Sequence, residues 1–258
     1  MSDSTQALEG LRVLVPRGGT WGEIVSRALR NHGANTVISP LVDFASSGEE
    51  AKLVEALHRL EAGEFDWLTA TNPTVVNVLR HHNTVIPTHT QLAVVGDATE
   101  AAFVAEGYEV ARTPEGENTA EGLLQTWPEI TGEKLRVLTL RSNVAKPVVT
   151  AGLIDRGHSV TQIVAFRTVG VPASVHTRED VESGHINVLL VATPQIAHEV
   201  KNQFADRPDS TLIACVGPNT REEAKRIGLR VDDGDEHPQV NQIIDAVESV
   251  IDYSDTLD

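Results

Sequence analysis

A chain of 258 residues with 40% hydrophobic and 22% charged residues has the composition of a globular protein that is long enough for two domains. Its formal net charge of −16 and its lack of a Lys/Arg stripe argue against nucleic acid as a partner, because a phosphate backbone is bound by clustered cations. No apolar run reaches the roughly 18 residues that a membrane-spanning helix needs, so we expect no membrane-spanning segment.

The N-terminus and the cysteine content indicate a compartment. Residues 1–6 lack the basic and apolar regions of a secretory signal, so we expect a cytoplasmic protein. The single cysteine, Cys215, excludes an internal disulfide and lies in the apolar run 212–216, which favours a small core residue over a nucleophile. We expect acidic runs such as Asp232–Glu236 to be solvated surface.

Short apolar segments alternate with amphipathic ones, and we interpret the short ones as buried parallel strands. They cover residues 12–16, 66–70, 92–96, 136–140, 187–192 and 211–217. Glycines after the helical segments are expected to end them in the left-handed conformation. These are Gly33, Gly63, Gly107, Gly157 and Gly228. Strands and helices that alternate at this spacing predict doubly wound α/β domains with helices on both faces of a parallel sheet.

Polar residues mark the expected helix starts, through capping boxes or through a polar cap before proline. The pairs are Thr20–Glu23, Ser47–Glu50, Asn72–Pro73 and Thr193–Pro194. Two β-branched stretches are long for buried strands, and we interpret them as crossovers between domains. The crossovers cover about 36–44 and 159–169, which makes one domain continuous (43–165) and the other discontinuous (1–40 with 170–258).

The chain also repeats itself at an offset of about 120 residues, which exceeds the unit of a solenoid. Arg12–Arg17 returns as Arg136–Arg141, and Val95–Thr99 returns as Val216–Thr220, each pair with a glycine at matched spacing further on. Between them, Thr71-Asn72-Pro73 matches Ala192-Thr193-Pro194. Three matched pairs in one order predict two related α/β modules with a ligand cleft between them.

Several motifs lie in one order over nearly the whole chain, from about residue 11 to 251. They are Val13–Arg17, Asp66–Pro73, Val95–Thr99, Glu117–Leu124, Arg136–Leu138 with Arg141, and Val216–Thr220. In their order and spacing the chain resembles the uroporphyrinogen-III synthase family of tetrapyrrole biosynthesis. The resemblance implies two α/β domains joined by a two-stranded β linker, in agreement with the crossovers expected from the residues.

The implied reaction needs no cofactor and is a cyclising lyase reaction in haem biosynthesis. Hydroxymethylbilane, a linear tetrapyrrole with eight carboxylates, loses its terminal hydroxyl and closes with inversion of ring D to uroporphyrinogen III. Because the substrate cyclises unaided to the uninverted isomer, positioning and placed hydrogen-bond donors are the main requirements. We expect a monomer, because a duplicated fold of this kind encloses its own cleft. The implied reaction is compatible with hand-over of the substrate from hydroxymethylbilane synthase.

By resemblance, Thr99 and Thr220 are the family's cleft threonines, and we interpret them as catalytic. Other polar groups follow strands and open helices, whose N-termini bind carboxylates. These candidate substrate-binding residues are Thr71, Asn72, Gly96, Thr193 and Gly217. Arg17 and Arg141 end the first strand of each half and are expected to bind carboxylates, as are Lys146 and Arg167. Alternatively, Asp97, Thr99, Asn219 and Thr220 simply cap helices, and the arginines pair with nearby acids.

Phe166 stands where the family often carries a tyrosine that is suspected of donating a proton to the leaving hydroxyl. Another group or water then assists, or activity is reduced, and a non-catalytic tetrapyrrole-binding or regulatory homologue is the main alternative. A two-lobed sugar- or amino-acid-binding protein would be expected to carry an export signal. The sequence contains no HExxH motif and no Cys/His spacing typical of a metal site. We expect His81–His82 to face solvent.

Overall fold

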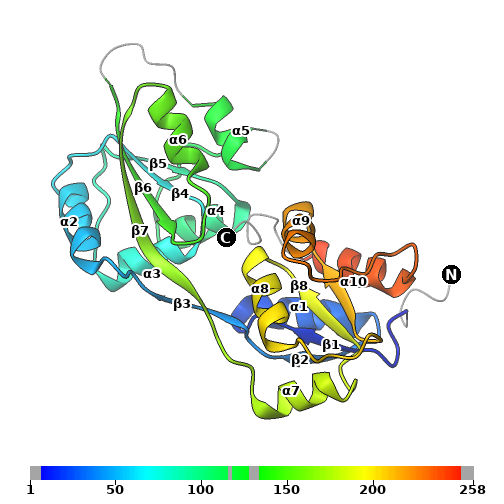
Figure 1. Cartoon of the computed structure of the whole chain (residues 1–258). Coiled ribbons are helices and arrows are strands. Elements are labelled where there is room, and N and C mark those ends of the chain that lie inside the picture. Colours follow the sequence, from blue (N-terminus) through cyan, green and yellow to red (C-terminus); the bar gives the residue numbers. More distant parts are fainter. Residues whose placement is uncertain (1–6, 116–117, 128–133, 251–258) are drawn as a thin grey trace. The chain divides into compact units, whose positions relative to one another are not determined.

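The computed structural model describes residues 7–115, 118–127 and 134–250, and it divides into two compact units. Unit 1 combines the described residues up to Asp43 with those from Val169 onward, and unit 2 is Phe44–Thr168. The polar N-terminus 1–6, and Glu117 of the sequence motif, lie outside the described residues. Figure 1 shows the order of the elements.

Unit 1 is built on a four-stranded sheet whose paired strands are all parallel. Its order is β2-β1-β8-β9, with β1 Arg12–Val15, β2 Asn35–Ile38, β8 Val188–Val191 and β9 Leu212–Cys215. Helices α1 (Gly19–Asn31) and α10 (Pro238–Glu248) pack on one face. The other face is covered by α7 (Val175–Glu182), α8 (Pro194–Gln203) and α9 (Pro218–Arg226).

Unit 2 has a five-stranded sheet in the order β3-β7-β6-β4-β5. The strands are β3 Val42–Ser46, β4 Trp67–Ala70, β5 Gln91–Val94, β6 Arg136–Ser142 and β7 Ser159–Gly170. Helices α2 (Glu50–Glu61), α3 (Thr74–His81) and α4 (Asp97–Ala105) pack on one face. Helices α5 (Ala120–Gln125) and α6 (Val148–Asp155) pack on the other. Helices on both faces confirm the predicted doubly wound α/β class.

The two sheets share one topology. The order β2-β1-β8-β9 in unit 1 corresponds strand for strand to β7-β6-β4-β5 in unit 2, to which β3 is added at the edge. In the chain, β1 and β2 belong to unit 1 and β4 and β5 to unit 2, whereas β6 and β7 belong to unit 2 and β8 and β9 to unit 1. Each unit therefore joins the first half of one repeat to the second half of the other, which explains why unit 1 is discontinuous.

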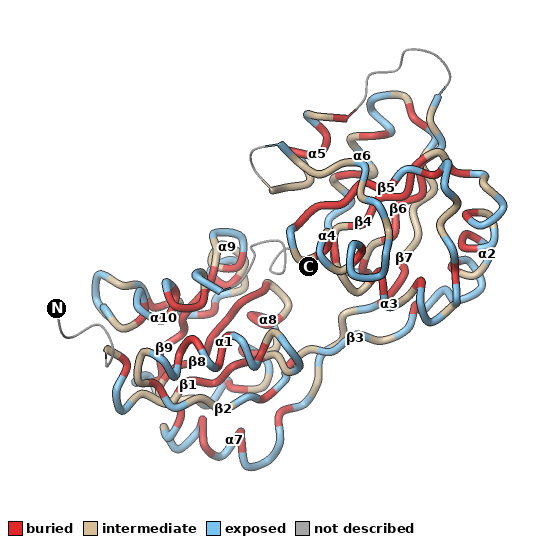
Figure 2. Tube along the Cα trace, turned by 180° about the vertical axis from the view of Figure 1, so that it is seen from behind, coloured by how far each residue is buried: buried red, intermediate tan, exposed pale blue. Residues whose placement is uncertain are grey.

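The central strands of each sheet are buried on both faces, and Figure 2 shows them in red. In β4, Leu68 and Ala70 pack against α2, α3 and α4, while Trp67 packs against α5 and α6. The alternation follows from the two-residue period of a strand. Such strands read as continuous apolar runs, which is why the sequence marks them clearly.

The chain passes between the units along β3 and β7, within which the division at Asp43 and Thr168 falls. The stretch that was expected to be one long crossover is two strands, because residues 35–38 pair in parallel with β1 and only 42–46 join the sheet of unit 2. Likewise, residues 159–166 of β7 pair with β6 inside the sheet. Much of each β-branched stretch predicted as a linker therefore pairs within a sheet.

The expected helix ends are confirmed and some expected starts are wrong. The five glycines predicted to end helices all have φ between 75° and 96°. Thr20, by contrast, lies inside α1, whose N-cap Gly18 offers no side chain. Ser47 does not cap α2 but accepts a hydrogen bond from Glu49 N (3.1 Å) and donates one to Val164 O (2.7 Å), which fastens the segment after β3 to β7.

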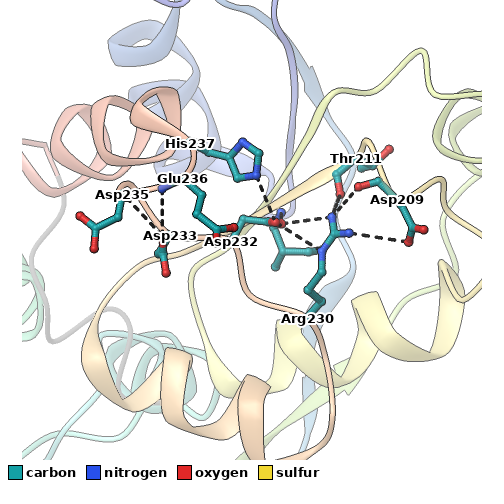
Figure 3. Close-up of polar contacts among 9 residues, drawn as sticks. Asp209, Thr211, Arg230, Asp232, Asp233, Asp235, Glu236 and His237 are labelled. Atoms are coloured by element: carbon teal, nitrogen blue, oxygen red, sulfur yellow. Dashed lines mark hydrogen bonds and ion pairs between the residues drawn. The ribbon is translucent and has the colours of Figure 1, made fainter.

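A polar cluster closes the β9 edge of the unit 1 sheet (Figure 3). Asp232 accepts a hydrogen bond from Ile213 N (2.8 Å) through its carboxylate, and its own N–H donates to Ile213 O (3.2 Å). Arg230 contacts the same carboxylate, with 3.3 Å between Nε and Oδ1. Asp232 is only 8% exposed, so the expectation that Asp232–Glu236 is all solvated surface is wrong at its first residue. Its carboxylate takes the place of a strand partner at an edge that would otherwise be unpaired.

Candidate functional site at the strand ends

The candidate residues lie where strands of each unit end. In unit 2 the parallel strands β4, β5 and β6 end at one edge of the sheet, and Thr71–Asn72 and Gly96–Asp97 follow the first two of them. In unit 1, Thr193 and Gly217 follow β8 and β9 in the same way. The carboxyl edge of a parallel sheet is where ligands bind in open α/β folds. These residues thus follow strands and precede helices in each unit, as the sequence indicated.

Two of the predicted cap residues use their side chains to begin helices. Asn72 Oδ1 accepts a hydrogen bond from Thr74 N at 2.7 Å at the start of α3. Thr193 Oγ1 accepts one from Ile196 N at 3.2 Å and is the N-cap of α8, with Pro194 in the first turn. Both residues are buried, at 5% and 4% exposure. Their side-chain oxygens thus satisfy N–H groups that a helix start leaves without an internal partner.

The helices α4 and α9 begin differently, at a glycine in the left-handed region. Gly96 has φ of +98° and Gly217 has φ of +78°, and neither helix has a side-chain cap. A residue with a Cβ is strained at such φ values, so the two turns favour glycine. The alternative that Asp97, Thr99, Asn219 and Thr220 cap these helices is therefore wrong.

Thr99 and Thr220 occupy matched positions in the first turn of α4 and α9, and both are buried, at 0% and 1% exposure. The hydroxyl of Thr220 donates to Ala192 O at 3.4 Å. The hydroxyl of Thr99 is buried and has no hydrogen-bond partner among the described residues. The first turn of α4 therefore holds an unsatisfied polar group among the described residues. A buried hydroxyl without a partner costs about 1–3 kcal/mol of stability.

Asn118, which was not among the predicted site residues, contacts the turn that opens α4. Its Oδ1 accepts from Gly96 N, and its Nδ2 donates to Asp97 Oδ1, both at 2.8 Å. The neighbouring Thr119 caps α5 by accepting from Gly122 N at 3.0 Å. Asn118 and Thr119 belong to the stretch Glu117–Leu124, and a polar pair directly before a helix is a sequence signal for side-chain to backbone bonding.

The four candidate cations have different surroundings. The Arg17 guanidinium lies over the Trp21 ring, 4.9 Å from its centroid. Arg141 donates to the carbonyls of Ser142 at the end of β6 and of Ala145 in the loop that follows. Arg167 Nε donates to Ser46 O at 3.1 Å and so ties β7 to the end of β3. Lys146 is exposed in the loop before α6. Arg141 and Arg167 thus also hold the backbone of unit 2.

Phe166 is a core residue of unit 2, 2% exposed. Its ring meets that of Phe44 edge to face, with 5.5 Å between the centroids. The register of β6 and β7 shifts between Arg141 and Ser142, so that Ser142 pairs with Phe166. At the position where the family often has tyrosine, this chain therefore has a phenylalanine packed in the core.

Other chemistry has little support among the described residues. Burial raises the pKa of the Cys215 thiol to about 12, and its side chain is fully buried, which confirms the expected core role. No group of three potential ligands suited to a metal ion occurs in the described part of the chain. His82 is half-buried and lies 3.3 Å from Glu50, so only His81 of the histidine pair is exposed as expected. None of the helices described has the length and apolarity to cross a membrane.

These features define the class of protein. Two doubly wound parallel α/β units of matched topology each present helix starts at the carboxyl edge of their sheet, an arrangement suited to anionic ligands. The model of the family described as uroporphyrinogen-III synthase HemD matches residues 23–245. The chain belongs to this uroporphyrinogen-III synthase family.

Solved structures agree with this assignment at the level of the fold. Uroporphyrinogen-III synthetase from Helicobacter pylori is similar with a TM-score of 0.59 at 14% identity, covering 93% of this chain and 99% of that one. A mutant uroporphyrinogen III synthase from Thermus thermophilus is similar with a TM-score of 0.58 at 17% identity and the same coverage. A search of curated protein sequences gives no significant match.

Proposed function

We propose that this chain is a uroporphyrinogen-III synthase that converts hydroxymethylbilane to uroporphyrinogen III and water. The observation that carries the proposal is the match of the family model over residues 23–245, which spans elements of both units. The solved structures named above support the same two-unit fold. The reaction is that of a cyclising lyase in haem biosynthesis.

The proposed chemistry requires the chain to choose a geometry. Loss of hydroxide from the hydroxymethyl carbon leaves an azafulvene cation, which the substituted carbon of ring D attacks to give a spiro intermediate. That intermediate breaks and recloses with ring D inverted, and a proton leaves the new ring junction. Binding that holds ring D for attack through its substituted carbon favours the type III isomer over the spontaneous type I product.

We assign the substrate carboxylates to the helix starts at the strand ends. Thr71, Asn72 and Gly96 in unit 2, and Thr193 and Gly217 in unit 1, stand where backbone N–H groups and the positive helix end favour anions. Arg17, Arg141, Lys146 and Arg167 supply the cations that an octacarboxylate needs on a chain of net charge −16.

Thr99 and Thr220 remain our proposed catalytic residues, with their hydroxyls aiding departure of hydroxide. Since both are buried, reaching the substrate requires a rearrangement of the first turn of α4 or α9. Of the two hydroxyls, only that of Thr99 is without a partner among the described residues, so we favour Thr99 as the donor. No protein cofactor takes part in the proposed reaction. We further propose that the protein is a cytoplasmic monomer that receives its substrate from hydroxymethylbilane synthase.

One observation favours a second candidate, a tetrapyrrole-binding or regulatory homologue without activity. Phe166 is buried in the core and cannot donate a proton, although the family often has a tyrosine there. The test is to follow hydroxymethylbilane as it disappears with and without protein, and separately to titrate the protein with uroporphyrin III. Consumption faster than the spontaneous rate supports the synthase. Tight porphyrin binding without faster consumption supports the second candidate.

A further inference from the structure

The start of α4 is held by a side chain from another part of unit 2. Asn118 precedes α5, yet it contacts both residues of the turn that opens α4. Its carbonyl oxygen accepts from Gly96 N, and its amide nitrogen donates to the Asp97 carboxylate, each at 2.8 Å. Because Gly96 adopts a φ of +98°, which other residues rarely adopt, this turn needs restraint to keep one conformation.

The amide group is the chemical match for its two partners. The turn offers Asn118 an N–H donor and a carboxylate acceptor, and an asparagine side chain has one acceptor and two donors to meet them. An aspartate at the same position would meet the backbone N–H equally well but would face the Asp97 carboxylate with a like charge. The contact thus depends on asparagine rather than on polarity alone.

The same turn contains the buried Thr99 hydroxyl, which lacks a hydrogen-bond partner among the described residues. In unit 1 the matched hydroxyl, that of Thr220, is satisfied by Ala192 O. The first turn of α9 is thus linked to Ala192 by its own threonine, whereas the start of α4 is held by Asn118. The Thr99 hydroxyl remains a donor that no described protein group uses.

We propose that Asn118 is a positioning residue for substrate at the start of α4. It fixes the Gly96–Asp97 turn, and with it the direction of the first N–H groups of α4 and the place of Thr99. It also holds the Asp97 carboxylate to one side, where it repels incoming substrate carboxylates less. The inference rests on the proposed function, since the substrate it concerns is the octacarboxylate of that reaction.

The decisive variants exchange the two partners. N118D keeps the acceptor for Gly96 N but places two carboxylates together, and we expect KM for hydroxymethylbilane to rise about tenfold, which corresponds to about 1.4 kcal/mol. The double variant D97N/N118D restores a donor facing an acceptor with their positions exchanged, and it keeps the net charge of the wild type. We expect it to return KM to within about threefold of wild type, a difference of less than about 0.7 kcal/mol.

A matched control separates positioning from general stability. T119A removes the cap of α5 one residue away and should lower the melting temperature, yet it leaves the α4 turn intact. We expect T119A to keep the wild-type KM and the wild-type ratio of type III to type I product. If T119A raises KM as N118D does, or if D97N/N118D fails to recover although it is folded, the positioning role is overturned.

Binding of uroporphyrin III, an octacarboxylate that needs no turnover, distinguishes failure of this inference from failure of the proposed function. If wild type makes no type III product but binds uroporphyrin III, weaker binding by N118D with recovery in D97N/N118D supports the positioning role without catalysis. Equal binding by wild type and N118D contradicts it. If the wild type neither turns over substrate nor binds the porphyrin, both proposals fall together.

Discussion

Thr220 and Thr99 hold matched positions in the two units, but among the described residues only Thr220 finds a hydrogen-bond partner, the carbonyl of Ala192 at 3.4 Å. Both side chains are buried in the first turn of a helix that follows a strand. The duplicated topology has therefore kept the threonine in both units, while its surroundings have diverged.

This difference predicts that removing the two hydroxyls changes the free energy of unfolding differently. T220V loses a hydrogen bond and leaves the Ala192 carbonyl without that donor, so the free energy of unfolding should fall by about 0.5–1.5 kcal/mol. T99V loses no bond to a described residue and should leave stability unchanged or raise it. If the Thr99 hydroxyl acts on the substrate, T99V should nevertheless lower turnover. Urea unfolding and initial rates on the same samples check both, and T99V with full activity would remove Thr99 from the site.

Replacing Asp97 alone tests whether carboxylates bind at the start of α4. D97N can still accept the hydrogen bond from Asn118, but it removes one negative charge from the first turn. We expect KM for hydroxymethylbilane to fall by about threefold at low ionic strength, which corresponds to about 0.7 kcal/mol. The gain should shrink as salt is raised, because the helix end and the charge are exposed to screening. An unchanged KM at low salt would place the substrate carboxylates elsewhere.

Arg17 allows the charge to be separated from packing. Its guanidinium lies 4.9 Å from the centroid of the Trp21 ring, so R17M keeps apolar contact with the ring and loses the cation. We expect R17M to raise KM about tenfold, or about 1.4 kcal/mol, while R17K recovers part of the loss. Equal KM values for R17M and wild type would mean that Arg17 is a surface residue held by its neighbours.

Restoring the family's tyrosine is expected to cost stability. From the sequence alone, F166Y should be harmless, but Phe166 is 2% exposed and meets the Phe44 ring. A buried phenol hydroxyl without a partner costs about 1–3 kcal/mol. We therefore expect a lower melting temperature, and a higher rate only if the hydroxyl reaches the substrate. A melting temperature equal to that of wild type would show that the new hydroxyl finds a partner.

A surface network on α8 and α9 predicts a specific pH dependence of stability. Hydrogen bonds from Arg226 and then from His198 lower the pKa of Glu223 to about 2 from the usual 4.5. A carboxylate with a lowered folded-state pKa stabilises the fold above pH 4.5 and loses that contribution as the pH falls from 4.5 to 2. E223Q should thus cost about 0.5–1 kcal/mol at pH 7, a value reduced by solvent screening. The cost should vanish near pH 2, and a constant difference from pH 7 to pH 2 would contradict the assignment.

The sequence was most informative where one local rule decides the outcome. The apolar run 187–192 predicts a buried strand, and β8 covers Val188–Val191 of it. A glycine such as Gly157 ends its helix because other residues are strained at its φ of +86°. Thr193 begins α8 as expected, since its side-chain oxygen, placed just before a proline, accepts from the N–H of Ile196 in the first turn. Such features depend on neighbours within a few positions in the chain.

Prediction failed where distant residues compete for the same group. Ser47 matches a capping box, but its hydroxyl donates to Val164 O, 117 positions away, and accepts from Glu49 N. The N-cap of α2 is Glu49 instead. Asp232 lies in an acidic run that predicts solvent exposure, but its carboxylate accepts a hydrogen bond from Ile213 N at the edge of β9. The tether from Asn118 to Gly96 joins residues 22 apart, and only the fold brings them together.

The most direct measurement of the central claim is the isomer made from hydroxymethylbilane. The substrate is generated in the assay by hydroxymethylbilane synthase, this protein is added in substoichiometric amount, and the product is oxidised and separated by chromatography into uroporphyrins I and III. The proposed function predicts type III as the dominant product, with many molecules formed per protein molecule, even though Phe166 replaces the usual tyrosine. Type I product alone, from protein shown to be folded, would contradict it.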